Sequence, residues 1–373
     1  MTAAVVTIVL AICLAVLVGW ALPAWAISRL LPGLEASGHL ITNYRGRRIP
    51  TGLGLVWLVW GAGVALVGSL AWLVMVWLSS GVTSGEVTWA TELADSSLSA
   101  AAIFAVFPVA LVIGAACFGL VDDLFGDSSA RGFRGHLSAM AHGRLTTGGL
   151  KLLGIGALAL ASGAFVSRQT QSQMAPGGWT GLLAGLAVWL LASLAIALTA
   201  NFVNLTDLRP GRALKTYCVL AAIGLAITLV DQMVSMRLFA GPIDVPYLAT
   251  QMVQLGGSKL ALIALVFGPV LAAWKFDLGE RAMLGDAGAN AMGALAGYLL
   301  VAYSPLWLDV VVVVIMLALN LASEKVSFSA VIERVGFLRW FDGLGRLPVE
   351  PTDMAVQEGD DDAWAGGPEA SRR

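Results

Sequence analysis

Nine long apolar runs constrain this chain more than any other feature of its sequence. Each run is long enough to cross about 30 Å of hydrocarbon as an α-helix. The composition agrees, because 58% of the residues are hydrophobic and only 12% are charged. The sequence therefore predicts an all-α, polytopic integral membrane protein with about nine transmembrane helices. The predicted spans are approximately residues 3–27, 53–79, 98–121, 147–167, 178–200, 213–231, 258–275, 286–303 and 305–322.

The distribution of lysine and arginine predicts how these spans are oriented. With the N-terminus outside, only Arg168, Arg237 and Lys259 of the 22 basic residues fall in outer connections. The outer connection 80–97 is acidic. Because basic residues concentrate in cytoplasmic connections, we expect an N-out/C-in topology in the plasma membrane. No basic stripe suited to nucleic acid is present in the sequence.

Four polar clusters fall on the cytoplasmic side of this predicted topology. The interiors of the predicted spans are almost free of ionisable groups, so any chemistry is expected at the cytoplasmic surface. The clusters are Pro50, Thr51, Gly52 and Gly54 before the second span; Asp122 and Asp123 ending the third; Asn201, Asn204 and Asp207 ending the fifth; and Gly285, Asp286 and Gly288 opening the eighth.

The adjacent acids Asp122 and Asp123 need a physical reason at the end of an apolar run. Two neighbouring carboxylates repel each other, and each is costly in contact with lipid, so they either face water or hold a cation. Mg²⁺ suits such a site, because it binds a few carboxylates together with water and phosphate oxygens. A solvated helix end is the alternative interpretation.

The other clusters are suited to phosphate and nucleotide groups. Asp286 opens a helix between two glycines, where backbone N–H groups are exposed, although an ordinary helix cap explains it as well. Asn201, Asn204 and Asp207 are three residues apart, so they share a face if the helix continues that far. Self-bonding side chains at a helix terminus are the alternative for this triplet.

Arg209, Arg212 and Lys215 follow directly and form a short cationic row suited to a diphosphate. Basic residues just inside a membrane also satisfy the topology rule and attract anionic lipid, so this alternative stays open. The turn from Pro50 to Gly54, preceded by three arginines, is a second candidate phosphate loop.

In combination, these motifs resemble those of the polyprenyl-phosphate N-acetylhexosamine-1-phosphate transferase superfamily, which includes the phospho-N-acetylmuramoyl-pentapeptide transferases. The resemblance depends on Pro-Thr-Gly-x-Gly, Asp-Asp, Asn-x-x-Asn-Leu-Thr-Asp and Gly-Asp-x-Gly, which occur in the same order. It covers about residues 40 to 300, most of the chain.

The resemblance implies Mg²⁺-dependent transfer of a sugar-1-phosphate from a UDP-sugar to polyprenyl phosphate, with release of UMP, for cell-envelope glycan synthesis. It implies that Asp123 and Asp286 hold Mg²⁺, or Mn²⁺ in its place, and that Asp122 orients or deprotonates the lipid phosphate. The positions matching Asn204 and Asp207 contribute to the nucleotide pocket, with Pro50 and Thr51 near it. Dimers occur in the family, so a homodimer is open.

Three departures from the family pattern bear on the substrate. Pro210 replaces an acid that follows the Asn-Leu-Thr-Asp motif in relatives. Gly126 replaces a lysine, so another cation must serve, and Arg131, Arg144 and Lys151 are the candidates. The histidine cluster of the peptidoglycan branch is absent, which argues against a pentapeptide substrate. A non-catalytic protein that binds lipid phosphate or regulates envelope synthesis is the alternative function, and a transporter is a weaker one.

The chain divides into three parts on these patterns. Residues 1–323 form the predicted transmembrane transferase-like domain. In residues 324–347, apolar side chains recur at helical spacing, which predicts one amphipathic helix on the inner leaflet. Residues 348–373 are acidic and contain glycine, which predicts a disordered tail.

Overall fold

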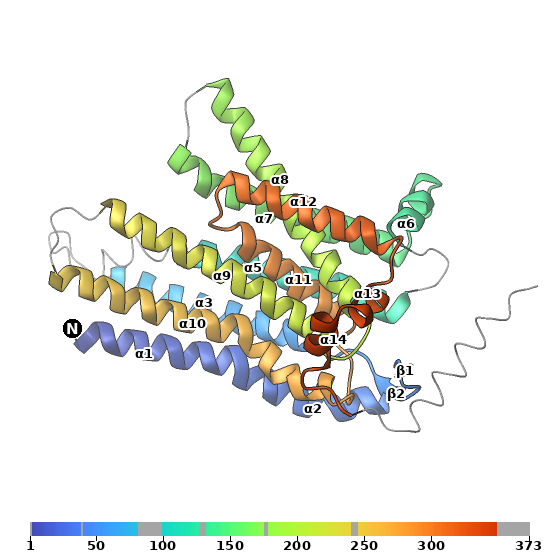
Figure 1. The fold of residues 1–373 in the computed structure, drawn as a ribbon. Coiled ribbons are helices and arrows are strands. Elements are labelled where there is room, and N and C mark those ends of the chain that lie inside the picture. Colours follow the sequence, from blue (N-terminus) through green and yellow to red (C-terminus); the bar gives the residue numbers. More distant parts are fainter. Residues whose placement is uncertain are drawn as a thin grey trace, which may run out of the picture.

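The computed structural model describes residues 2–38, 40–80, 99–126, 132–174, 178–239 and 245–348, and these fold into a helical bundle (Figure 1). The predicted all-α class is confirmed for this part of the chain, apart from one two-stranded hairpin. Residues 349–373 of the predicted tail, the connection 81–98 and Arg131 lie outside the described residues.

Eight helical segments among the described residues are long and apolar enough to cross a membrane, as expected for a multi-pass membrane protein. The first is a continuous run made of α1, a π-helical segment η1 and α2. The long helices are α1 (Thr2–Val16), η1 (Leu17–Ala21), α2 (Leu22–Ala36), α3 (Leu55–Ser80), α5 (Ser99–Phe125), α7 (Thr147–Met174), α8 (Trp179–Thr206), α9 (Arg212–Phe239), α10 (Val245–Leu278) and α12 (Leu306–Ser323).

The predicted span that is not among these eight segments is the eighth, residues 286–303, which forms α11 (Gly285–Val301), a 17-residue helix at the centre of the bundle. Every residue from Ala287 to Val301 is buried, and the helix packs against α5, α8 and α9. Glycines allow this close packing, since a Cβ at Gly293 or Gly297 would overlap α8 at Ala200 or Ile196. This helix therefore belongs to the core of the protein, and its length is about 26 Å at 1.5 Å per residue.

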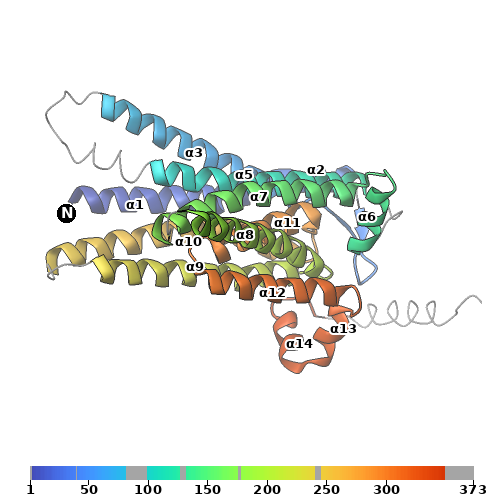
Figure 2. The same cartoon turned by 90° about the horizontal axis from the view of Figure 1, so that it is seen from above.

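The helices lie lengthwise beside one another, and one end of the bundle carries most of the shorter elements (Figures 1 and 2). At this end α2 leads into a hairpin of β1 (Leu40–Thr42) and β2 (Arg48–Pro50), which pair antiparallel. The short helices are α6 (Gly132–Ala141), α13 (Phe328–Arg334) and α14 (Gly336–Gly343). We refer to this as the site end of the bundle.

Two sequence predictions differ from the structure in detail. The helices that carry the acid motifs extend beyond the predicted spans, so Asp122 and Asp123 lie within the last turns of α5. The single amphipathic helix predicted over residues 324–347 is wrong as a continuous helix. Val335 has an extended backbone (φ −93°, ψ 112°) that separates α13 from α14, so the chain turns at that residue.

Candidate functional site

The carboxylate of Asp123 joins α5 to the beginning of α11. Its two oxygens accept the backbone N–H groups of Asp286 at 2.8 Å and Ala287 at 3.0 Å. The first turn of a helix has N–H groups without helical partners, so a carboxylate is stabilised there. Gly285 has φ +69°, and a Cβ at this position would overlap the Asp123 carboxylate. The glycine is required both for the backbone conformation and for the close approach.

Lys151, the fifth residue of α7, contacts two acids from different helices. Its Nζ lies 2.6 Å from Oδ2 of Asp122 and also donates to Oδ2 of Asp286. The Thr147 hydroxyl is a further hydrogen-bond partner of Asp122. The acids Asp122, Asp123 and Asp286 therefore surround a position that favours a cation. Of the two predicted substitutes that the structure describes, Arg144 and Lys151, it is Lys151 that contacts these carboxylates.

The predicted phosphate loop lies against the same end of α11. Met283 donates its backbone N–H to the Pro50 carbonyl at 2.9 Å, and Gly54 donates to the Leu284 carbonyl at 3.0 Å. Thr51 forms a parallel bridge with Met283. The Pro-Thr-Gly-x-Gly and Gly-Asp-x-Gly motifs, more than 200 residues apart, are thus paired through their backbones.

Two glycine contacts bring the helices of this site close together. A Cβ at Gly54 would overlap the backbone of Gly288, and a Cβ at Gly119 would overlap the carbonyl group of Asp286. Backbone atoms cannot move aside as a flexible side chain can. These glycines therefore set the distance of α3 and α5 from the beginning of α11.

Asp207, just after α8, also reaches this site. Its carboxylate accepts the backbone N–H of Gly285. Burial raises the pKa of Asp207 well above its ordinary value, and the nearby carboxylates of Asp277, Asp286 and Asp123 raise it further. The acids that end the third and fifth predicted spans and that open the eighth therefore lie close together in the structure.

Asp277, at the end of α10, is an acid of this region that the sequence analysis did not identify. Its side chain is buried, and it accepts the backbone N–H groups of Gly211 at 2.6 Å and of Leu284. It thus connects the loop after α8 to the segment before α11. The sequence does not mark Asp277 as a site residue, because it is a single acid near the end of an apolar run and its partners are backbone groups distant in sequence.

The two asparagines of the third motif have different surroundings. The Oδ1 atom of Asn204 is buried and has no hydrogen-bond partner among the described residues. Asn201 is exposed and donates to Asn320 of α12 at 2.6 Å. Asn204 therefore has a free acceptor for a ligand, whereas Asn201 contacts a neighbouring helix.

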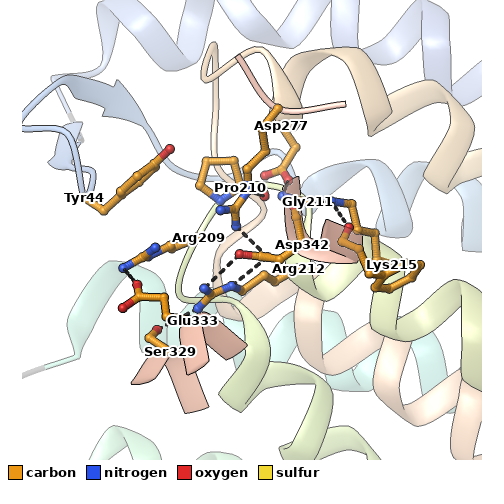
Figure 3. A network of polar contacts seen from close by, with 12 residues as sticks. Tyr44, Arg209, Pro210, Gly211, Arg212, Lys215, Asp277, Ser329, Glu333 and Asp342 are labelled. Carbon is orange, nitrogen blue, oxygen red and sulfur yellow. Dashed lines mark hydrogen bonds and ion pairs between the residues drawn. The ribbon is translucent and has the colours of Figure 1, made fainter. Parts of the chain in front are cut away.

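The cationic row binds the C-terminal segment of the chain (Figure 3). Arg209 pairs with Glu333 at 2.5 Å. The buried side chain of Arg212 donates to Asp342 of α14 and Ser329 of α13, and that of Lys215 donates to two backbone carbonyls of α14. The structure therefore gives these cations protein partners in place of the diphosphate predicted from the sequence.

The donor set suits a hard divalent cation. Mg²⁺ is commonly held by one or two carboxylates and completes its coordination with water and phosphate oxygens. Asp123 and Asp286 offer such carboxylates at the beginning of α11, where Asp123 also accepts two helix N–H groups. In the part of the chain that the structure describes, no group of three or more His, Cys, Asp or Glu side chains is arranged as a metal site by itself.

The fold and the site together define a multi-pass membrane protein with a cluster of acids at one end of its helical bundle. A scan against protein-family models finds no match to this chain, and a search of curated proteins finds none either.

Proposed function

We propose that this protein is a Mg²⁺-dependent phosphotransferase of the plasma membrane. It transfers a sugar-1-phosphate from a UDP-sugar, or a related nucleotide-sugar, to polyprenyl phosphate, and releases UMP for cell-envelope glycan synthesis. The observation that carries the proposal is the convergence of Asp122, Asp123, Asp207 and Asp286 at the beginning of α11. The reaction takes place at the cytoplasmic face, where the basic connections are expected.

Phosphoryl transfer needs positioning and neutralisation of charge more than covalent help from the protein. Asp123 and Asp286 would hold Mg²⁺, which supplies positive charge to the transferred phosphate when it is bound. Asp122 orients the attacking lipid phosphate, or accepts its proton. Lys151 fixes the Asp122 carboxylate through their 2.6 Å contact and adds positive charge beside the phosphates.

The nucleotide-sugar binds on the side of Asp207. Asn204 offers a buried acceptor there, and the backbone of Pro50 and Thr51 closes against Met283 next to it. Asp277 holds the loop after Asp207 by accepting the Gly211 N–H. These groups form a polar surface next to the acids that would hold the metal.

Turnover by the purified full-length protein tests the proposal. The protein in detergent is given polyprenyl phosphate, Mg²⁺ and a panel of nucleotide-sugars, and release of UMP is measured. We expect Asp123→Asn and Asp286→Asn to reduce kcat by about 10²-fold or more, because each removes a charge that the transition state requires. Asp309→Asn is a matched control, since Asp309 is a buried acid that bonds Ser304 at the far end of α11. Turnover that survives both site variants would rule out this metal assignment.

Lys151 also supports a second candidate function. The ammonium group of Lys151 lies between Asp122 and Asp286 and neutralises part of their charge without a metal ion. A protein that only binds lipid phosphate would need no other cation at this position. Binding of polyprenyl phosphate that is independent of Mg²⁺, with no UMP release from any donor, would favour this non-catalytic function over transfer.

A further inference from the structure

The loop between α8 and α9 is held from two sides. On one side, the buried carboxylate of Asp277 accepts the Gly211 N–H at 2.6 Å. On the other, Nε of Arg346 donates to the Pro210 carbonyl at 3.0 Å. Because Asp207 immediately precedes this loop, its position in the site depends on both attachments. Arg346 belongs to residues 328–348, which comprise α13, α14 and the turn after them, and which we call the C-terminal clamp.

Asp342 is the centre of the contacts made by the C-terminal clamp (Figure 3). Its two oxygens accept Nε and Nη2 of Arg212 at 2.9 and 3.0 Å, and Oδ1 also accepts Nη2 of Arg346 at 2.9 Å. Lys215 donates to the backbone carbonyls of Phe341 and Asp342. The buried Asp342 carboxylate thus neutralises two arginines, with a lysine nearby. Removing the carboxylate would leave these buried positive charges without an opposite charge.

The C-terminal clamp is also attached to the hairpin at the site end. Arg45 donates to the carbonyls of Leu347 at 2.8 Å and Pro348 at 2.9 Å, and it pairs with buried Glu280. The clamp therefore connects the loop after Asp207 to the segment that leads into the Pro50 turn. The same two parts of the chain also contact each other directly, since the Arg209 guanidinium lies 5.2 Å from the centre of the Tyr44 ring.

The sequence of the loop explains why it needs support from outside. Its residues Leu208, Arg209, Pro210 and Gly211 contain no acid, and proline has no N–H with which to bond a neighbouring side chain. Arg209 within the loop and Arg212 directly after it add positive charge on both sides of Pro210 and Gly211. The carboxylates that neutralise these arginines, Glu333 and Asp342, both come from the C-terminal clamp.

We propose that Asp342 is a positioning residue, through which the C-terminal clamp holds the loop after Asp207 in the conformation that binds the nucleotide-sugar. The nature of the ligand rests on the proposed function, whereas the positioning of the loop does not. A loop fixed before binding loses less conformational entropy on binding, so the clamp acts on donor affinity.

Two readouts on the full-length protein test this role. The first is the mobility of a nitroxide label on Leu208→Cys, a largely exposed loop position, in a chain whose three cysteines are replaced by serine. The second is the steady-state kinetics of UMP release. Both are measured for Asp342→Asn and for Arg346→Gln, which removes the bond to Pro210 together with the ion pair between Arg346 and Asp342. Arg339→Ala is the matched control, because Arg339 is an exposed cation on the same helix.

We expect Asp342→Asn to increase the mobility of the label and to raise the KM for the nucleotide-sugar by about tenfold, with a smaller change in kcat and in the KM for polyprenyl phosphate. Asp342→Glu should recover part of the loss, and the control should differ from wild type by less than about twofold. A folded Asp342→Asn protein with wild-type label mobility and donor KM would overturn the proposal. If that variant does not fold, unchanged mobility in Arg346→Gln overturns it. If the wild-type protein turns over no donor, the proposed function is refuted. The mobility of the nitroxide label in the Asp342 and Arg346 variants then still tests whether the C-terminal clamp positions the loop.

Discussion

At the scale of single residues, Lys151 is the first test of the acid cluster. Lys151→Met removes a cation that is 14% exposed and leaves Asp122 and Asp286 facing each other. We expect a loss of about 2–3 kcal/mol of stability, less than the ~3–5 kcal/mol of fully buried pairs, because Asp286 is 30% exposed. Thermal unfolding in detergent measures this loss. Mg²⁺ should raise the Tm of the variant more than that of wild type, since the ion replaces the missing charge.

The control for this experiment is Lys275→Met, which removes an exposed lysine near the end of α10. It should leave both the Tm and its response to Mg²⁺ close to those of wild type. Equal effects of the two substitutions would mean that Lys151 is an ordinary surface cation.

Asp342 makes stability depend on pH in a defined direction. Burial by itself would raise the pKa of Asp342, but the hydrogen bond from Arg212 and the charges of Arg346 and Lys215 outweigh it and hold the pKa below its ordinary value of 3.8. The unfolded chain therefore takes up this proton at a higher pH than the folded protein does. The stabilisation is present above about pH 4 and is lost as the pH falls below that value.

Thermal unfolding of wild type and Asp342→Asn from about pH 6 to pH 3 checks this dependence. The Tm difference between them should be largest at the upper end and should shrink toward the lower end. A difference that stays constant over this range would show that the Asp342 carboxylate is not preferentially ionised in the folded protein.

Site residues could be predicted from the sequence where they lie in a recognisable motif. Asp122, Asp123, Asp207 and Asp286 could be placed on one side of the membrane because their motifs fall at the cytoplasmic ends of the third, fifth and eighth predicted spans. Asp277 could not be predicted, since it binds backbone N–H groups of loops that only the tertiary structure brings near it.

The row of Arg209, Arg212 and Lys215 shows a second limit. Its cationic character is evident from the sequence. Its partners lie more than 100 residues away in the C-terminal clamp, and charge alone cannot distinguish a diphosphate from a carboxylate of the same chain.

At the scale of helices, Gly119 sets the contact between α5 and α11. Gly119→Ala would place a Cβ against the Asp286 carbonyl, so α5 must shift and carry Asp123 away from its two N–H donors. Overpacking of this kind costs about 1–3 kcal/mol. We expect a lower Tm and a loss of UMP release that is larger than the loss of stability explains.

Gly156→Ala on α7 provides the comparison for this prediction. A Cβ at Gly156 meets nothing within 4 Å, and alanine favours a helix by about 1 kcal/mol relative to glycine. This variant should be as stable as wild type or more stable. If Gly119→Ala were also as stable as wild type, the contact between α5 and α11 would not depend on the glycine at position 119.

α14 has an aromatic side that points away from the rest of the C-terminal clamp. Phe337 and Trp340 are 68% and 60% exposed, and their ring centroids are 5.8 Å apart. Aromatic rings next to basic residues favour a bilayer interface, so the predicted location at the membrane surface stays a prediction for this shorter helix. An environment-sensitive fluorophore on Phe337→Cys, in the cysteine-free chain in anionic bilayers, should be quenched by brominated lipid. The same fluorophore on Arg339→Cys, about 200° around the helix, should be quenched much less.

Helices were predictable where an apolar run is long, and less so where two short elements share one pattern. Residues 324–347 have a continuous helical spacing of apolar side chains, yet the chain turns at Val335. The clamp contacts of Arg212 and Arg45 hold α14 and residues 347–348 in place, and these contacts depend on the whole fold.

At the scale of the whole molecule, α11 determines the arrangement of the other helices. It is rich in glycine and alanine, and small residues allow helices to approach closely in the absence of a hydrophobic driving force within lipid. The sequence predicted a span here but not that this helix would be the buried centre. The same packing brings the motifs of α3, α5 and α8 to one end of the bundle, so the site and the core depend on one helix.

The distribution of basic residues predicts the orientation of this bundle in the membrane, which the structure does not test. The orientation determines which compartment supplies the substrates. The connection before α7 and the beginning of α8 lie at opposite ends of α7, so single cysteines at Arg144 and Trp179, both exposed, report on opposite sides. In a chain without its native cysteines, an impermeant maleimide added to right-side-out vesicles should label Trp179→Cys at once. Arg144→Cys should react only after the vesicles are opened. The reverse pattern would put the acid cluster on the outer face, where nucleotide-sugars are not supplied by the cytoplasm, and the transferase proposal would fail together with the topology.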